Sequence, residues 1–550
     1  MSPAVARQAP LGGVAPVSQR VMNLATFLSQ SARRLPERPA LACGDTVVTW
    51  RELDRRAAAL ARALSEQGIG KGDRVLMHSR NNLELVEIMF AVFRLGAVWV
   101  PTNFRIAPDE AAYLAEASGA SAFFCQGEFA EHVRAVVEAV PGLRLLVRIG
   151  PGDFGQAEVA ELRNRYLDQP LPPADVTRDD PCWFFFTSGT TGRPKAAVLT
   201  HGQMAFVVTS HLCDLMPGTT DADASLVVAP LSHGAGIHLL TQVAHGAASI
   251  LPEGNRFDPD DIWRLVQQWR VSNMFTVPTI VKMLVEHPSV DAWDHASLRY
   301  VIYAGAPMYR EDQKRALNKL GKVLVQYFGL GEVTGNITVF PPHLHEAEDG
   351  PAARIGTCGF ERTGMQVSIQ DAAGREVEPG VTGEVCVCGP AVFAGYYDNP
   401  QANAKSFRNG WFRTGDLGHM DAQGYVYITG RESDMYISGG SNIYPREIEE
   451  KTLAHPAVAE VAVLGVPDPV WGEVGVMVCV LREGQQLEEP ALQGWLEGNL
   501  ARYKLPRRIF FWDALPRSGY GKITKKMVRE ELAARGCLPL QAQAASTAGA

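Results

Sequence analysis

A loop rich in glycine and hydroxyl side chains separates two apolar stretches of the chain. The segment TSGTTGRPK follows an apolar run that predicts a strand at 182–186, and a second strand is predicted at 196–199. Glycines let successive N–H groups turn toward one anion, while hydroxyls and an ammonium add donors and positive charge. These residues could hold a polyphosphate, although the spacing does not fit a Walker A loop and a plain hairpin turn is the alternative from composition alone. The candidate phosphate-binding residues are Thr187, Ser188, Gly189, Thr190, Thr191, Gly192 and Lys195.

This segment resembles the phosphate-loop signature of the adenylate-forming superfamily, which includes acyl-CoA synthetases, nonribosomal adenylation domains and firefly luciferase. The opening pattern TWRELDRRAAALARAL…GDRV…NFR also resembles the start of acyl-CoA synthetases. Further motifs of the superfamily follow in the expected order, from about residue 24 to about residue 535. The resemblance implies that the protein activates a carboxylic acid with ATP.

Several motifs resemble the nucleotide contacts of this superfamily. The segment AGAP, at 304–307, matches the adenine contact, with Ala304 in place of the first glycine. In QYFGLGE, Phe328 takes the place of the ring that stacks on adenine, and Glu332 that of the carboxylate that helps to hold Mg²⁺, together with Thr187. Gly331 departs from the usual threonine, which removes a hydroxyl that faces the phosphates. The resemblance further assigns Asp416 to the ribose, and Arg431, Gly305, Ala306, Pro307, Tyr327 and Gly329 to the rest of the nucleotide site.

The resemblance places the acyl group beside His233, in the segment APLSHGAGIHLL, and beside Tyr303 and Tyr327. From the residues alone, each of these side chains could equally be an ordinary structural one. The segments expected to line the pocket, 231–242, 275–279, 303–307 and 327–340, contain no Arg or Lys. A second carboxylate would need a charged partner, so we expect an uncharged aliphatic or aromatic monocarboxylate of small to medium size.

The C-terminal motifs resemble those of a mobile domain. The hinge position falls on Ser433, where the superfamily usually has Asp or Lys, and Gly439 and Gly440 match the loop that lines the coenzyme A tunnel. The segment LPRSGYGK ends in Lys522, which the resemblance places between the substrate carboxylate and the α-phosphate as a catalytic residue, with Glu332 and Thr187. The alternatives without a functional role are a solvated basic helix face for the Lys522 segment and a hairpin turn for the loop with Gly439 and Gly440.

The expected function is that of an ATP-dependent carboxylic acid–CoA ligase, with ATP, Mg²⁺ and coenzyme A. Three alternatives remain open. They are transfer of the acyl group to a carrier-protein thiol, an oxygen-dependent luciferase, and a nucleotide-binding regulator that has lost catalysis. No carrier domain follows in this sequence, which favours coenzyme A as the acceptor.

The secondary structure expected around these residues indicates an α/β protein. Alternating strands and helices indicate doubly wound mixed sheets in a large N-terminal domain with several subdomains, followed by a small mobile α+β domain. The expected divisions are a flexible arm at 1–20, an AMP-binding domain at 21–430, a mobile domain at 431–537 and a disordered tail at 538–550. At 550 residues the chain is too long for a single core.

Bulk composition is that of an ordinary globular protein. The net charge of −8 comes without a basic cluster, so nucleic acid is not an expected partner. The nine scattered cysteines suggest reduced thiols rather than a zinc site. No signal peptide or membrane span is predicted, so a cytoplasmic location is expected, and a homodimer is left open.

Overall fold

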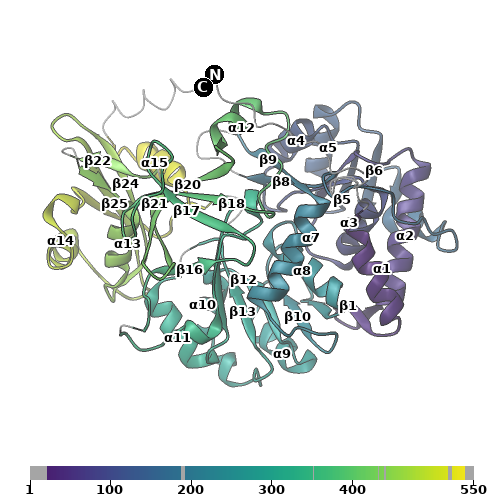
Figure 1. The fold of residues 1–550 in the computed structure, drawn as a ribbon, viewed down its shortest axis with the longest axis horizontal. Coiled ribbons are helices and arrows are strands. Elements are labelled where there is room, and N and C mark those ends of the chain that lie inside the picture. Colours follow the sequence, from purple (N-terminus) through teal and green to yellow (C-terminus); the bar gives the residue numbers. More distant parts are fainter. Residues whose placement is uncertain are drawn as a thin grey trace, which may run out of the picture.

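The computed structural model describes residues 22–187, 193–254, 256–306, 308–350, 352–431, 433–438, 441–517 and 523–538. Its described part is an α/β fold in which two large sheets and their helices occupy most of the chain, and a smaller sheet lies at the C-terminal end (Figure 1). None of the described helices is long and apolar enough to cross a membrane.

A seven-stranded sheet carries the first half of the phosphate-binding segment. Its order is β7-β6-β5-β3-β4-β8-β9, and its pairs are parallel except for the antiparallel hairpin of β8 and β9. The parallel part agrees with the alternation of strands and helices expected from the sequence. The strands are β3 (Arg74–His78), β4 (Val98–Pro101), β5 (Ala122–Gln126), β6 (Leu145–Ile149), β7 (Ala157–Glu158), β8 (Pro181–Thr187) and β9 (Lys195–Thr200).

A fourteen-stranded sheet carries the other candidate residues of the large domain. Its order is β17-β18-β20-β21-β16-β15-β14-β13-β12-β10-β11-β1-β2, with β19 paired to β20. Pairing is parallel from β14 through β13, β12, β10 and β11 to β1, and antiparallel from β14 to β17, so the sheet is mixed. The strands are β1 (Pro39–Cys43), β2 (Thr46–Thr49), β10 (Ala224–Val227), β11 (Ala248–Leu251), β12 (Asn273–Thr276), β13 (Tyr300–Tyr303), β14 (Leu324–Phe328), β15 (Thr338–Phe340), β16 (Thr357–Glu361), β17 (Gln366–Gln370), β18 (Gly383–Cys388), β19 (Phe407–Arg408), β20 (Trp411–Met420) and β21 (Val426–Arg431).

Helices cover both sheets, and α7 and α8 lie near the centre of the molecule (Figure 1). Thr49 Oγ1 accepts a hydrogen bond from the Glu52 N–H and so caps α2. A hydrophobic core unites α1–α3, α7 and α8 with strands of both large sheets. The helices are α1 (Ala25–Arg34), α2 (Trp50–Glu66), α3 (Leu83–Leu95), α4 (Pro108–Ser118), α5 (Ala130–Ala139), α6 (Val159–Asn164), α7 (His201–Ser210), α8 (Gly234–His245), α9 (Pro259–Trp269), α10 (Pro278–Glu286), α11 (Arg310–Leu320) and α12 (Pro400–Ser406), with a π-helical turn η2 (His211–Leu215) after α7.

The chain passes to a separate five-stranded sheet after β21. This sheet has the order β23-β22-β25-β24, with β26 paired to β25. Its strands β24 and β25 form a long antiparallel hairpin whose pairing continues to Asp468 and Gly472. The elements are β22 (Tyr436–Ser438), β23 (Ser441–Ile443), α13 (Pro445–Leu453), β24 (Val458–Asp468), β25 (Gly472–Leu481), α14 (Glu489–Glu497), β26 (Arg508–Phe511) and α15 (Lys525–Ala534).

Candidate active site

The last residue of β8 contacts the acidic motif of the other large sheet. Thr187 Oγ1 donates a hydrogen bond of 2.8 Å to Glu332 Oε1, across 145 positions of sequence. Glu332 lies in a 3-10 turn, η4 (Gly331–Val333), and only 5% of the residue is exposed. Its second oxygen, Oε2, has no hydrogen bond to any residue in the described ranges. A buried carboxylate held through one oxygen can offer the other as a hard ligand to a cation.

Tyr396 is a site residue that the motif comparison missed. Its hydroxyl donates a second 2.8 Å hydrogen bond to Glu332 Oε1, and Lys195 Nζ lies 4.5 Å from the centroid of its ring. Burial, with the nearby Glu332 carboxylate, raises the pKa of Tyr396 above its usual range, so the hydroxyl stays protonated and donates. Tyr396 therefore links the lysine of the phosphate-binding segment to the acidic residue. The only sequence feature that could have pointed to Tyr396 is its position in the segment YYDNPQ.

Asp416 and Arg431 are paired across β20 and β21. Arg431 Nε donates to Asp416 Oδ1 over 3.0 Å, whereas Oδ2 is buried and has no hydrogen-bond partner among the described residues. Burial raises the pKa of the Asp416 carboxyl above its usual value, and the Arg431 guanidinium opposes that rise. A buried carboxylate oxygen without a donor is costly, and the hydroxyls of a ribose would supply one.

The turn after β13 consists of small residues. Ala304 is buried, and Gly305 adopts φ +82°, a conformation that favours glycine. Ala306 is exposed. Phe328, half-buried at the end of the neighbouring β14, is followed by Gly329, where a Cβ atom would lie 2.4 Å from the backbone of Gly335. The flat turn and the ring at adjacent strand ends form an arrangement that can accept a planar base.

His233 occupies the N-cap position of α8 without a side-chain capping hydrogen bond, and its ring contacts Phe185. The two ring centroids are 5.3 Å apart in an edge-to-face arrangement. Phe185 lies two residues before Thr187 on β8, and so on the same side of the strand. A Cβ atom on Gly331 would lie 2.6 Å from Phe185 Cδ1, so the departure from threonine at 331 has a steric cause. The sequence did not single out Phe185.

Tyr327 and Tyr303 have different surroundings. The Tyr327 ring lies 6.0 Å from both Phe275 and His211. Tyr303 is fully buried, its hydroxyl donates to Gln326 Oε1 over 3.0 Å, and it packs in the core with residues of α9, α10 and α11. The place of Tyr303 beside the acyl group stays a prediction, as does that of Tyr327, and both side chains are buried.

A buried charge near Tyr327 also escaped the sequence reasoning. Arg362 is fully buried, and its Nε donates to Asp214 Oδ2 over 2.9 Å. Its Nη2 donates to Ser210 Oγ, also over 2.9 Å. Arg362 precedes β17 and lies outside the segments expected from the sequence to line the acyl site. Asp214 balances the charge of Arg362, whereas Arg362 Nη1 is buried and has no hydrogen-bond partner among the described residues.

Several expected site residues lie outside the described part of the chain. They are Ser188, Gly189, Thr190, Thr191, Gly192, Pro307, Gly439, Gly440 and Lys522. Ser433 is described as an exposed residue in the turn between β21 and β22. In the described ranges, no cluster of three or more His, Cys, Asp or Glu side chains could hold a metal by itself. Glu332 thus fits a cation that takes its remaining ligands from phosphate groups.

The chain resembles known proteins over most of its length. The family model of the AMP-binding enzymes matches residues 28–397, and that of the AMP-binding enzyme C-terminal domain matches residues 447–522. A feruloyl-CoA synthase from Amycolatopsis sp is 37% identical over 512 residues, which cover 93% of this chain and 99% of that protein. An indoleacetate–CoA ligase from Aromatoleum aromaticum is 33% identical over 513 residues, covering 93% and 98%.

A solved structure shares the fold over most of the chain. The ATP-bound MatB from Rhodopseudomonas palustris superimposes with a TM-score of 0.81 at 29% identity, over 93% of this chain and 99% of that one. The extent of these matches and the arrangement of Glu332, Asp416 and Arg431 lead to one conclusion. The chain belongs to the AMP-binding enzyme family, as an AMP-forming acid–CoA ligase that binds ATP and a carboxylic acid.

Proposed function

We propose that this ligase works in two steps through an acyl-adenylate, on an uncharged aromatic or aliphatic acid of small to medium size, with coenzyme A as the acceptor. The observation that carries the proposal is the hydrogen bond between Thr187 and Glu332. It joins the first residue of the phosphate-binding segment to the acidic motif. A carboxylate beside a triphosphate would repel it unless a cation binds between them, so this arrangement favours a bound cation.

In the first step a carboxylate oxygen of the acid attacks the α-phosphorus of ATP. The bond from phosphorus to the bridging oxygen breaks, and pyrophosphate leaves with that electron pair. Mg²⁺, when bound at Glu332 and Thr187, neutralises phosphate charge. Lys195 and Lys522 add positive charge, while Asp416 and Arg431 position the ribose and the rest of the nucleotide.

In the second step the thiol sulfur of coenzyme A attacks the acyl carbon. The bond from that carbon to the phosphate oxygen breaks, AMP leaves, and the thiol proton is released. The proposal includes a rotation of the C-terminal domain, taken as residues 431–537, about a hinge at Ser433. This movement withdraws Lys522 and brings Gly439 and Gly440 to the coenzyme A path. The hinge needs a residue with tolerant backbone angles rather than a particular side chain.

Two observations support the choice of acid. The charge of Arg362 is balanced by Asp214, so the pair offers no net positive charge to a second carboxylate, although Nη1 is buried without a hydrogen-bond partner among the described residues. The feruloyl-CoA synthase and the indoleacetate–CoA ligase are named for acids that combine an aromatic group with one carboxylate. An aromatic acid is therefore the first class to test.

The deciding experiment measures AMP and pyrophosphate over a panel of carboxylic acids, each with and without coenzyme A. We expect turnover that requires both an acid and coenzyme A, with aromatic monocarboxylates ahead of dicarboxylates. Pyrophosphate release that does not depend on coenzyme A would instead favour a carrier-protein thiol as acceptor. Lack of turnover across the panel would contradict the proposed function.

A further inference from the structure

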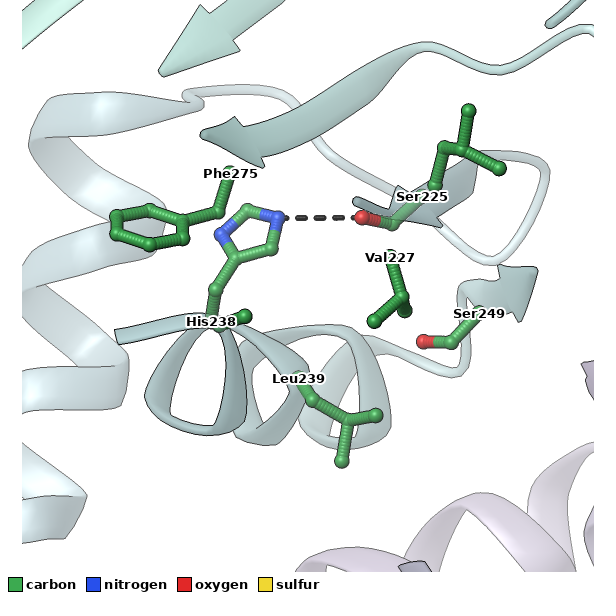
Figure 2. A pocket seen from close by; sticks show the side chains of 8 residues that line it. Ser225, Val227, His238, Leu239, Ser249 and Phe275 are labelled. Atoms are coloured by element: carbon green, nitrogen blue, oxygen red, sulfur yellow. Dashed lines mark hydrogen bonds between the residues drawn. The ribbon is translucent and has the colours of Figure 1, made fainter. Parts of the chain in front are cut away.

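A cavity beside α8 is too small to be a further substrate or cofactor site. Figure 2 shows His238 at this place, between Phe275 and Ser225. The volume of the cavity is about 10 Å³, which is room for about one water molecule.

A tyrosine of α4 contacts the chain directly before Lys195. The Tyr113 hydroxyl donates a hydrogen bond of 3.0 Å to the carbonyl oxygen of Pro194, across 81 positions of sequence. The guanidinium carbon of Arg193 lies 5.0 Å from the centroid of the same ring, within the range of a cation–π contact. In Figure 1, α4 lies beside β9. One side chain therefore contacts both residues that precede the lysine.

The backbone at this point is restricted by proline. Pro194 has a fixed φ angle and no N–H, and a residue before proline, here Arg193, favours an extended backbone. The carbonyl is the only polar group of the Pro194 backbone, and the Tyr113 hydroxyl donates to it. Because few backbone angles remain free, a fixed carbonyl also fixes the direction in which the chain enters β9.

The tyrosine belongs to a packed helix. Leu114 of α4 is buried in one core with Phe184 and Phe186 of β8. The Tyr113 ring is half-buried and packs against the same core. A side chain on a packed helix is held more precisely than one on a loop. The hydroxyl is therefore a fixed point for the chain that carries Lys195.

A second tyrosine contacts the lysine itself. Lys195 is the first residue of β9, and its Nζ lies 4.5 Å from the centroid of the Tyr396 ring. The segment of that tyrosine is also bonded to β9, because the Val198 N–H donates to the Gly395 carbonyl over 2.9 Å. A lysine side chain is a flexible four-carbon stem, so the place of its ammonium depends on a fixed backbone and on a contact near its tip. Tyr113 supplies the first and Tyr396 the second.

We infer that Tyr113 is a positioning residue for acyl-adenylate formation, which acts through Pro194 to place Lys195 against the phosphates of ATP. The inference rests on the proposed function, in which Lys195 adds positive charge there, and it gives a role to a residue outside the site motifs. Acyl-AMP has one phosphate where ATP has three, so transfer to coenzyme A needs less of this charge. Tyr113 should therefore matter for ATP and the first step, and much less for AMP and the second.

Tyr113→Phe removes the hydroxyl and keeps the ring that contacts Arg193. Calorimetric titration with Mg²⁺ and without an acid should show the Kd of ATP raised by about 5- to 20-fold, because the Pro194 carbonyl loses a donor. The Kd of AMP should change by less than about 2-fold. Pyrophosphate release at low ATP should fall as the ATP affinity does, whereas transfer from supplied acyl-AMP, made from the best acid of the panel, should stay within about 2-fold.

Tyr300→Phe is the matched control. The Tyr300 hydroxyl also donates to a proline carbonyl, that of Pro217 over 2.6 Å, and the guanidinium carbon of Arg299 lies 5.4 Å from its ring centroid. Tyr300 begins β13, whereas the turn of small residues in the candidate site follows the other end of that strand. This variant should leave both affinities and both half-reactions unchanged.

An unchanged Kd of ATP in Tyr113→Phe would overturn the inference. Equal losses for ATP and AMP, or in both half-reactions, would also overturn it, since a general loss of structure produces them. The comparison of the two nucleotides needs no acid, so it tests Tyr113 separately from the choice of substrate. No turnover of any acid in the unmodified protein would instead contradict the proposed function.

Discussion

A side chain at position 331 and the ring of Phe185 cannot occupy the site together as it stands. A Cβ atom on Gly331 would lie 2.6 Å from Cδ1 of that ring, 2.7 Å from Cε1, and 2.8 Å from Thr187 Cγ2. Because Phe185 also contacts His233, the ring occupies the space between the phosphate-binding strand and the candidate acyl site. The glycine at 331 is therefore complementary to the phenylalanine at 185.

Gly331→Ala should destabilise the protein by about 1–3 kcal/mol, because overpacking forces the ring or the turn to move. Thermal or urea unfolding measures this. The control is Gly494→Ala on α14, where a Cβ meets nothing within 4 Å and the change should be neutral or stabilising. Adding Phe185→Ala should make the Gly331→Ala change less costly. If the two effects simply add, the pair is not coupled.

Glu332→Gln should lower kcat for pyrophosphate release by about 100-fold or more, because the neutral amide cannot stabilise a cation beside the phosphates. Tyr396→Phe keeps the carboxylate and removes one of its two hydroxyl donors, so we expect a smaller loss and a need for more Mg²⁺. Titration of Mg²⁺ at fixed ATP measures both effects. Glu138→Gln, on an exposed part of α5, is the control. An unchanged response to Mg²⁺ in Glu332→Gln would contradict the cation assignment.

Asp416→Ala should remove the ability to distinguish ATP from 2′-deoxy-ATP. In the unmodified protein the unpartnered Oδ2 would accept from the ribose, so the deoxy nucleotide should raise KM by about 10-fold. In the variant the two nucleotides should have similar KM values. Steady-state measurement of KM for both nucleotides decides the matter, and a preserved preference in the variant would show that Asp416 does not contact the ribose.

Lys522→Ala should slow acyl-adenylate formation by about 100-fold or more, judged from the loss of other charge-stabilising donors. Transfer from supplied acyl-AMP to coenzyme A should be largely spared, because the lysine has withdrawn in that step. Single-turnover assays of each half-reaction separate the two effects. Equal losses in both halves would argue against domain rotation.

Acid should destabilise the fold through its buried histidines. Burial lowers their pKa values, to about 3 for His78 and about 4 for His201, His238 and His345, and well below the usual value for His211. Since the unfolded pKa is higher, the unfolded state binds more protons between about pH 4 and pH 6.5. Stability is therefore complete above about pH 6.5 and falls as the pH drops below it. For one such residue with a folded pKa of about 4, the loss is about 2 kcal/mol at pH 5.

Melting temperatures at pH 7.5 and pH 5.5 test this expectation. The midpoint should fall at the lower pH, and His345→Gln, which removes one of these groups, should reduce the fall. A midpoint that does not change between the two pH values would mean that the histidines remain accessible to protons.

The sequence by itself determined the family, the α/β class and the order of the site motifs. Local patterns such as the Thr49 cap and the alternation of strands and helices depend on neighbouring residues, so they can be read along the chain. Other relationships join distant positions: Tyr396 with Glu332, Phe185 with Gly331, and Arg362 with Asp214. Only the tertiary structure decided these, and it also placed Tyr303 in the core, because which side chains meet depends on strand register and on the face that each strand turns inward.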